Sequence, residues 1–142
     1  MQSMAMELKM QIVTPFGQIF DGEVASCSLP GVEGHFQVLP HHADLVSLLE
    51  IGPIKLQLKD NSEKWLASSG GYCEVRDNQL KVIIESAEFA EEIDIKRAQA
   101  ALKRAEERLK SHDPNVDITR AKMAMARALN RIKIAQISQS LH

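Results

Sequence analysis

Apolar residues recur with two different spacings along the chain, and the spacing changes near residue 90. Before that point they alternate with polar residues, most strictly in 54–59 (IKLQLK), and turn residues interrupt the alternation every several positions. Such alternation predicts short strands that each turn one face to a core. Because no helical pattern lies among these strands, they predict an antiparallel β-sandwich or flattened barrel.

Short runs of apolar and β-branched residues place the individual strands. We expect strands at 6–13, 18–20, 23–29, 35–39, 45–49, 54–59, 64–68, 72–75 and 80–85. The Asp-Gly pair at 21–22 and the Gly-Pro pair at 52–53 are predicted breaks between strands. The Gly-Gly pair at 70–71 predicts a bulge or corner where two backbone segments approach closely.

After residue 90 the chain contains a repeat. Residues 94–110 (DIKRAQAALKRAEERLK) and 117–133 (DITRAKMAMARALNRIK) are identical at 9 of 17 positions. Apolar positions step by three and four in both copies, which predicts two amphipathic helices with narrow apolar seams. These seams are Ile95, Ala98, Leu102, Ala105 and Leu109, and Ile118, Ala121, Met125, Ala128 and Ile132. With an N-cap at Asp94 and Asp117 and a breaker at Pro114, the copies predict an antiparallel two-helix hairpin.

The seam is rich in alanine, so the two helices can pack closely while they bury little apolar area. Each helix also carries three arginines, which occupy equivalent positions in the two copies of the repeat and lie away from the seam. They are Arg97, Arg104 and Arg108 in the first copy, and Arg120, Arg127 and Arg131 in the second. A weakly held, arginine-bearing hairpin is suited to move and to bind an anion; the alternative is an ordinary solvated basic face.

Charge and glycine content support a division of the 142 residues into two parts. Residues 1–90 carry 6 Lys/Arg and 12 Asp/Glu, whereas residues 91–142 carry 11 and 7. All seven glycines lie at or before Gly71. We therefore predict a β-sandwich domain at 1–87 and a helical hairpin domain at 88–142.

Cysteine use and hydropathy bear on the cellular setting. Cys27 and Cys73 form no CxxC pair and are expected to be free thiols in a reducing compartment. The first ten residues lack the basic start and apolar core of a signal peptide. Because no stretch approaches the roughly 18 apolar residues of a membrane span, we expect membrane association only through a partner.

Motifs of catalysis are missing from the sequence. It contains neither a GxxxxGK[ST] phosphate loop nor a GxGxxG fingerprint. His35, His41 and His42 lack a Cys or carboxylate at ligand spacing, so no metal site is predicted. The serine pair at 68–69 is not a nucleophile elbow, because no helix follows it. The acidic overall charge argues against nucleic acid, which leaves a non-catalytic β module with a mobile, anion-binding hairpin.

Three segments together resemble a known family. They are LPGVEGHFQVLPHHADL (29–45), SSGGYCEV (68–75) and IDIKRAQAAL (93–102), and they resemble the epsilon subunit of bacterial-type rotary (F-type) ATP synthases. The resemblance extends from about residue 6 to residue 141. The family pattern usually has Gly and Pro where this chain has Gln37 and Asp44. The family implies an all-β domain, a sandwich of about ten strands, followed by a two-helix hairpin.

The resemblance also implies a place in a larger machine. Family members are non-catalytic subunits of the central rotor, peripheral at the cytoplasmic face of the bacterial inner membrane. Their sandwich binds the gamma subunit and the ring of c subunits. Their hairpin lies folded on the sandwich or extends into the alpha/beta catalytic ring, where it blocks ATP hydrolysis. On this basis Glu33 and His42 are expected to face the c ring.

A signature at 93–98 (IDIKRA) matches family members that bind ATP in the folded hairpin, as a regulatory ligand and not a required cofactor. The residues implied in binding are Glu88, Asp94, Arg97, Arg104, Arg127 and Arg131. Spacings of seven and four residues place each arginine pair along one helix face, so folding brings several guanidinium groups together. No metal is implied.

Two other classes of function remain open at this stage. One is a small stand-alone ATP-binding regulatory protein, which co-purification with a gamma subunit would distinguish from a rotor subunit. The other is an enzyme with an unrecognised site. The sequence offers no nucleophile and base arrangement for such an enzyme.

Overall fold

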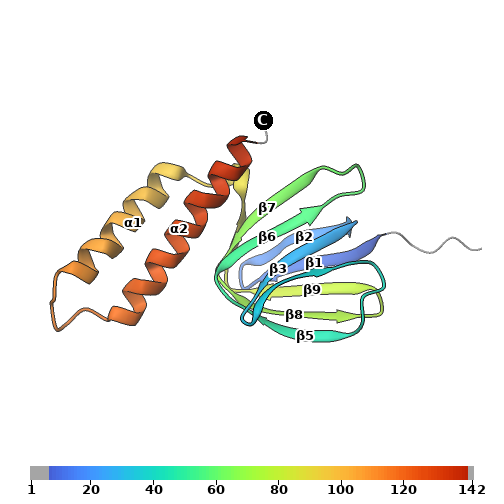
Figure 1. The fold of residues 1–142 in the computed structure, drawn as a ribbon, viewed down its shortest axis with the longest axis horizontal. Helices are drawn as coiled ribbons and strands as arrows, with labels where there is room; N and C mark the ends of the chain where they lie inside the picture. Colours follow the sequence, from blue (N-terminus) through green and yellow to red (C-terminus); the bar gives the residue numbers. More distant parts are fainter. Residues whose placement is uncertain (1–6, 141–142) are drawn as a thin grey trace, which may run out of the picture.

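The computed structural model describes residues 7–140, as ten strands followed by a short 3-10 helix and two α-helices (Figure 1). The strands are β1 (Leu8–Thr14), β2 (Gly17–Val24), β3 (Ser26–Gly31), β4 (Gly34–Val38), β5 (Leu45–Leu49), β6 (Gly52–Gln57), β7 (Glu63–Ser68), β8 (Gly71–Arg76), β9 (Gln79–Ile84) and β10 (Ala87–Phe89). The helices are η1 (Ala90–Glu92), α1 (Ile95–Lys110) and α2 (Ile118–Ser140). The predicted sandwich and hairpin are confirmed.

One continuous sheet folds over on itself to make the two layers of the sandwich. Its strand order is β10-β7-β6-β3-β5-β8-β9-β1-β2, and β4 pairs with β3 beside this path. β3 joins the layers, since it pairs with β6 along several residues but meets β5 only at Gly31, opposite Leu49. All strand pairs are antiparallel except β1 and β9, which run parallel.

The core lies between the two layers and follows the alternation of the sequence. Every second residue of β1, β6 and β9 is buried, because successive side chains of a strand point to opposite faces. These residues are Leu8, Met10, Ile12, Ile54, Leu56, Leu80, Val82 and Ile84. The hairpin contributes no residue to this cluster, so the sandwich has a core of its own.

The predicted break at 21–22 is wrong, because β2 continues through it. Gly22 pairs with Met10 of β1 within the antiparallel ladder, in the part before its register shift at Ile12 and Val13. A Cβ atom at Gly22 would lie 3.2 Å from the ring of Phe20, so the residue makes room for that side chain. Gly22 therefore lies within a strand, where it allows close packing, and does not form a turn.

The predicted turn at 52–53 is also wrong, since both residues begin β6 and pair with β7. A Cβ atom at Gly52 would lie 2.7 Å from the Cβ atom of Pro30, so only glycine lets β6 approach β3 this closely. By contrast, the predicted close approach at 70–71 is confirmed. Gly71 has a φ of +155°, and a Cβ atom there would lie 2.1 Å from the carbonyl oxygen of Ile83.

Both helices begin at the predicted caps. An Oδ1 atom of Asp94 accepts a hydrogen bond from the Arg97 N–H at 3.1 Å, and Asp117 caps α2 in the same way at 3.1 Å. The alanines of the seam are buried between the helices: Ala98, Ala105, Ala121 and Ala128. Ile118 is the exception, with 58% of its surface exposed, because it lies at the first position of α2 beside the connecting loop.

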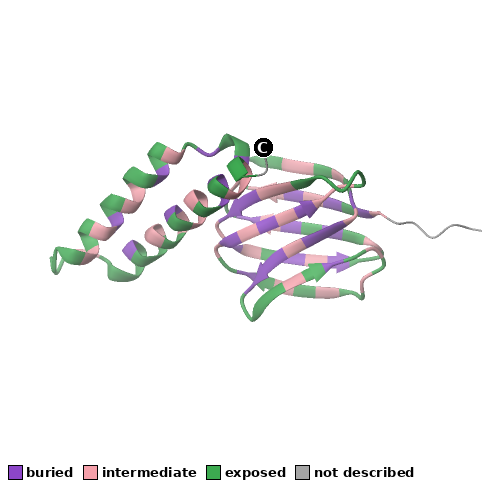
Figure 2. Ribbon diagram, turned by 45° about the horizontal axis from the view of Figure 1, so that its top comes forward, coloured by how far each residue is buried: buried purple, intermediate pink, exposed green. Residues whose placement is uncertain are grey.

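The hairpin rests on the sandwich through α2, while α1 packs on α2 on the side away from the sheet (Figures 1 and 2). A small apolar cluster forms this docking contact: Ala67, Ala90, Ile93, Ile134 and Ala135, with Trp65 and Ile95 partly buried against it. β10 leads directly into this contact and pairs with β7. The predicted domain boundary between residues 87 and 88 falls inside β10.

Candidate functional site

Four of the six residues implied in nucleotide binding line one small cavity where the hairpin meets the sandwich. They are Glu88, Asp94, Arg97 and Arg131, which come from β10, the start of α1 and the middle of α2. The cavity has a volume of about 90 Å³. Small-molecule pockets usually enclose roughly 300–1,000 Å³, so this cavity is too small to enclose a whole nucleotide.

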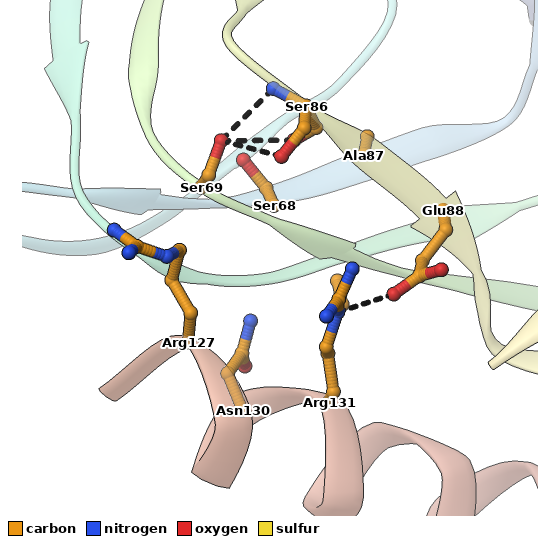
Figure 3. A pocket seen from close by; sticks show the side chains of 9 residues that line it. Ser68, Ser69, Ser86, Ala87, Glu88, Arg127, Asn130 and Arg131 are labelled. Atoms are coloured by element: carbon orange, nitrogen blue, oxygen red, sulfur yellow. Dashed lines mark hydrogen bonds and ion pairs between the residues drawn. The ribbon is translucent and has the colours of Figure 1, made fainter. Parts of the chain in front are cut away.

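An ion pair crosses the docking contact. The Nε atom of Arg131 on α2 lies 2.5 Å from Oε1 of Glu88 on β10 (Figure 3). Both side chains are partly exposed, so water weakens the attraction between them. The pair therefore orients the two side chains more than it holds the hairpin in place.

The two carboxylate oxygens of Asp94 differ in their surroundings. One oxygen caps α1 through the Arg97 N–H. The other forms no hydrogen bond or ion pair within residues 7–140 and can accept a hydrogen bond from a ligand hydroxyl or amine. The Arg97 guanidinium is exposed beside it, and it forms no ion pair with any described residue.

A second cavity, of about 180 Å³, lies on the other side of the ion pair. Figure 3 shows Arg127, Asn130 and Arg131 pointing from α2 toward a wall of serines at the end of β7 and the start of β10. Sequence reasoning identified the arginines but missed Ser68, Ser69 and Ser86. Only the pairing of β7 with β10 brings these serines together, so no local motif marks them.

Arg104 lines neither cavity and is exposed. It follows Arg97 by seven residues on α1, which at roughly 1.5 Å per residue places it about 10 Å further along the helix. The structure thus brings five of the six implied residues to the two cavities and leaves Arg104 on the outer surface.

The two residues expected to face the c ring lie apart. Glu33 is exposed in the turn before β4, and His42 follows the other end of that strand. Since β4 has 5 residues and a strand rises roughly 3.3 Å per residue, about 16 Å of extended chain separates the two ends. The Nδ1 atom of His42 lies 2.7 Å from the carbonyl oxygen of Ala43.

An exposed apolar surface lies beside Glu33 and was not predicted from the sequence. Val32, Val46, Leu48 and Tyr72 are all exposed, and Val46 has 71% of its surface accessible. A shallow hollow lined by 31–36 and 46–48 lies at the same place. Large exposed apolar patches usually mark contacts with other proteins. The sequence pattern that could have predicted this surface lies at 45–49 (LVSLL), where apolar residues fall on both faces of β5.

Metal-ligand side chains and the two cysteines are the remaining chemical groups to place in the part of the chain that the structure describes. No three His, Cys, Asp or Glu side chains there are placed to hold a metal ion. Cys27 and Cys73 are free thiols in the core, and burial raises the pKa of Cys73 to about 11. Burial also raises the pKa of Cys27, and neither thiol is suited to act as a nucleophile. No described helix has the length and apolar character needed to cross a membrane.

Two family descriptions match almost all of the chain. "ATP synthase, Delta/Epsilon chain, beta-sandwich domain" matches residues 7–90, and "ATP synthase, Delta/Epsilon chain, long alpha-helix domain" matches residues 91–136. The ATP synthase epsilon chain of Desulforamulus reducens is 40% identical over 94% of this chain and 100% of its own length. That of Pelotomaculum thermopropionicum is 46% identical over 71% of this chain and 75% of its own length.

Solved structures share the fold at low sequence identity. A chain in the Euglena gracilis mitochondrial ATP synthase (OSCP/F1/c-ring) superposes with a TM-score of 0.80 at 22% identity, over 99% of this chain and 85% of that one. A chain in the central stalk and c ring of the Tetrahymena thermophila mitochondrial ATP synthase gives a TM-score of 0.55 at 17% identity. That match covers 96% of this chain and 98% of the other. These likenesses concern the arrangement of strands and helices.

Proposed function

The chain belongs to the ATP synthase delta/epsilon chain family, and we propose that it is a non-catalytic rotor subunit whose hairpin regulates ATP hydrolysis. Its sandwich binds the gamma subunit and the c ring. Its hairpin, when released, reaches the alpha/beta catalytic ring. As a peripheral part of that complex it acts at the cytoplasmic face of a bacterial inner membrane.

The docking contact between hairpin and sandwich is the observation that carries this proposal. Ile93 and Ile134 are its only buried residues larger than alanine among the described residues, and Trp65 and Ile95 are partly buried against it. At roughly 1.5–3 kcal/mol for a fully buried aliphatic side chain, the contact contributes only a few kcal/mol. Because the sandwich has a separate core, α2 can leave it without unfolding the rest of the molecule.

ATP is the ligand we propose to hold the hairpin in its docked state. Glu88, Asp94 and the guanidinium groups of Arg97 and Arg131 offer acceptors and donors in one place, and Arg127 lies beyond the ion pair. A ligand that binds only the docked state stabilises it by RT ln(1 + [L]/Kd), about 2.7 kcal/mol at a hundredfold excess over Kd. Ample ATP would keep the hairpin folded, and depletion would release it.

The released hairpin would present its arginines to carboxylates of the catalytic ring. Arginine and carboxylate groups form bidentate, charge-assisted hydrogen bonds, which hold a defined geometry with little apolar burial. Arg104, which lines neither cavity, is fully available for such a contact. We assign the exposed apolar surface of Val46, Leu48 and Tyr72 to the gamma subunit, and Glu33 at the edge of this surface to the c ring.

Deletion of residues 91–142 in the assembled complex tests the regulatory role. We expect the truncated subunit to co-purify with gamma and the c ring in normal amounts, because the core of the sandwich does not include the hairpin. ATP hydrolysis at low ATP should rise several-fold over the complex with the full chain. Equal hydrolysis in two complexes with equal gamma content would show that the hairpin is not the inhibitory element.

A further inference from the structure

The loop between β4 and β5 carries His42, and a turn far along the chain holds this loop. The side-chain oxygen Oδ1 of Asn78 accepts a hydrogen bond from the backbone N–H of His41 at 2.8 Å. Asn78 lies between β8 and β9, so the two residues are 37 positions apart in the sequence. The contact lies at the end of the sandwich away from the helices, since β9 starts there and runs toward β10 (Figure 1).

The same amide group is anchored to the start of β1. Its nitrogen Nδ2 donates a hydrogen bond to the carbonyl oxygen of Glu7 at 3.0 Å. The backbone carbonyl oxygen of Asn78 also accepts a hydrogen bond from the Lys9 N–H at 3.3 Å. Because His41 supplies a donor and Glu7 an acceptor, a side-chain amide satisfies both, and it does so in this orientation alone. Asn78 therefore links the loop to the sheet that encloses the core.

The backbone of the turn restricts which residue can occupy this position. Asp77 and Asn78 have φ angles of +49° and +60°, as a type I′ hairpin turn requires. Glycine, asparagine and aspartate adopt this conformation most readily. Of these three, glycine lacks the side chain, and aspartate keeps an acceptor for His41 but has no donor for Glu7. Substitution by glycine or aspartate therefore changes the contacts while it keeps the backbone conformation.

Burial of side chains does little to fix the loop. None of residues 39–44 is buried, Leu39 has 50% of its surface exposed, and none of them belongs to the core cluster. His41 also has a φ of +63°, which is uncommon for a residue other than glycine. Loops with few buried apolar contacts open at a small cost in free energy, so hydrogen bonds to rigid elements largely determine their conformation.

We propose that Asn78 is the positioning residue for His42, and that it holds the loop 39–44 in the conformation that contacts the c ring. The inference rests on the proposed binding of the sandwich to the c ring, in which His42 is expected to take part. A loop that already has its bound conformation loses less conformational entropy when it binds. Loss of the Asn78 amide therefore weakens the contact, although no residue that touches the ring has changed.

Hydrogen exchange in the isolated full chain tests the structural half of the proposal. In Asn78→Gly the backbone N–H of His41 loses the amide acceptor, so its exchange should be faster by about fivefold or more. In Asn78→Asp a carboxylate oxygen still accepts from His41, and the exchange should stay close to that of the unmodified chain. Glycine suits a type I′ turn, so the melting temperature should change little. Equal exchange at His41 in Asn78→Gly and the unmodified chain would overturn the proposal.

The amount of c ring that co-purifies with the assembled complex tests the functional half. Asn78→Gly should lower this amount, and Asn78→Asp should restore most of it. In a chain that already carries His42→Ala, Asn78→Gly should cause no further loss, because the amide acts through His42. Losses that add in the double variant would overturn the positioning role.

Asn61→Gly is the matched control. Asn61 also has a positive φ, +68°, and lies in the turn between β6 and β7 at the same end of the sandwich. Its side chain forms no hydrogen bond with the described residues. Asn61→Gly should therefore leave both the exchange at His41 and the amount of c ring unchanged. A loss of c ring equal to that in Asn78→Gly would show that the Asn78 amide has no particular role.

These variants separate failure of the positioning role from failure of the proposed contact. If His42→Ala lowers the amount of c ring and Asn78→Gly does not, the contact stands and the positioning role is wrong. If His42→Ala lowers nothing, His42 makes no contact with the ring, and the positioning role is wrong with it. If Asn78→Gly speeds exchange at His41 and lowers the amount of c ring only where His42 is present, the proposal stands.

Discussion

At Gly71 an added side chain would strike the neighbouring strand. A Cβ atom there would lie 2.1 Å from the carbonyl oxygen of Ile83 and 2.8 Å from the Cα atom of Ile84. Both atoms belong to the backbone of β9, so neither can rotate away. We predict that Gly71→Ala lowers the free energy of unfolding by about 2 kcal/mol or more, as overpacking in cores does. Urea denaturation of the isolated chain measures it.

Gly17 provides the matched control, because it also has a positive φ, +129°, but its Cβ position has nothing within 4 Å. Gly17→Ala should therefore show only the cost of the backbone conformation. If the two substitutions lower the stability equally, the contact with β9 is not the cause.

Single residues differ in how far the sequence predicts them. Asp94 and Asp117 were predictable as caps, because a cap depends on the next three residues alone. The Ser68 hydroxyl inside the second cavity was not, because its surroundings come from residues about sixty positions away on α2. Interactions between neighbours in the sequence can be predicted from it. The distant residues that the fold brings together cannot.

The two helices offer an internal comparison at the scale of the element. Asp94 and Asp117 make the same capping hydrogen bond at 3.1 Å, but only Asp94 lines the cavity assigned to ATP. We predict that Asp94→Ala and Asp117→Ala each cost about 1 kcal/mol of stability, the usual loss of an N-cap. Only Asp94→Ala should weaken ATP binding, as measured by calorimetry on the isolated chain.

The repeat makes Asp117→Ala a control for any general loosening of the hairpin. Asp94→Asn is a second control variant, since asparagine still caps the helix but lacks the negative charge of aspartate. Equal loss of ATP affinity in Asp94→Ala and Asp117→Ala would indicate that capping, and not ligand contact, explains the effect. Absence of ATP binding by the full chain would rule out the nucleotide proposal itself.

Elements were predicted where periodicity is strong and missed where glycine has a packing role. The helices follow a clear period of 3.6, and β6, β8 and β9 follow a clear period of 2. β2 was divided at Gly22 because glycine usually signals a turn, although here it makes room for Phe20. β10 was missed because its three half-buried residues give no pattern, and its pairing with β7 defines it.

At the scale of the whole molecule, Glu33 and His42 lie at opposite ends of β4 and can be tested separately. Glu33 is exposed at a turn and forms no hydrogen bond or ion pair through its side chain with the described residues, whereas His42 is half-buried and its Nδ1 atom lies 2.7 Å from the carbonyl oxygen of Ala43. We predict that Glu33→Ala reduces co-purification of the c ring more than His42→Ala does. The isolated variants should remain folded, since neither side chain belongs to the core.

Glu85→Ala is the matched control, because Glu85 is also exposed but lies in the bend after β9. It should leave the amount of co-purified c ring unchanged. Normal c-ring content and proton pumping in the Glu33/His42 double variant would remove this turn region from the proposed contact. The spatial separation of Glu33 and His42 was not predicted, because the two residues are close in sequence although the extended strand β4 lies between them.

The parallel pairing of β1 with β9 has a consequence for how the chain folds. Met10 lies beside Leu80, so this ladder cannot form until the intervening seventy residues have been brought together. Closing so long a loop lowers the conformational entropy of the chain before the stabilising contacts form. Folding rates therefore fall as the number of such distant contacts rises. The helical hairpin depends on neighbours in sequence and can form within microseconds of leaving the ribosome. Both helices follow β9 in the sequence, so β1 keeps one edge unpaired during synthesis until β9 emerges, before either helix does.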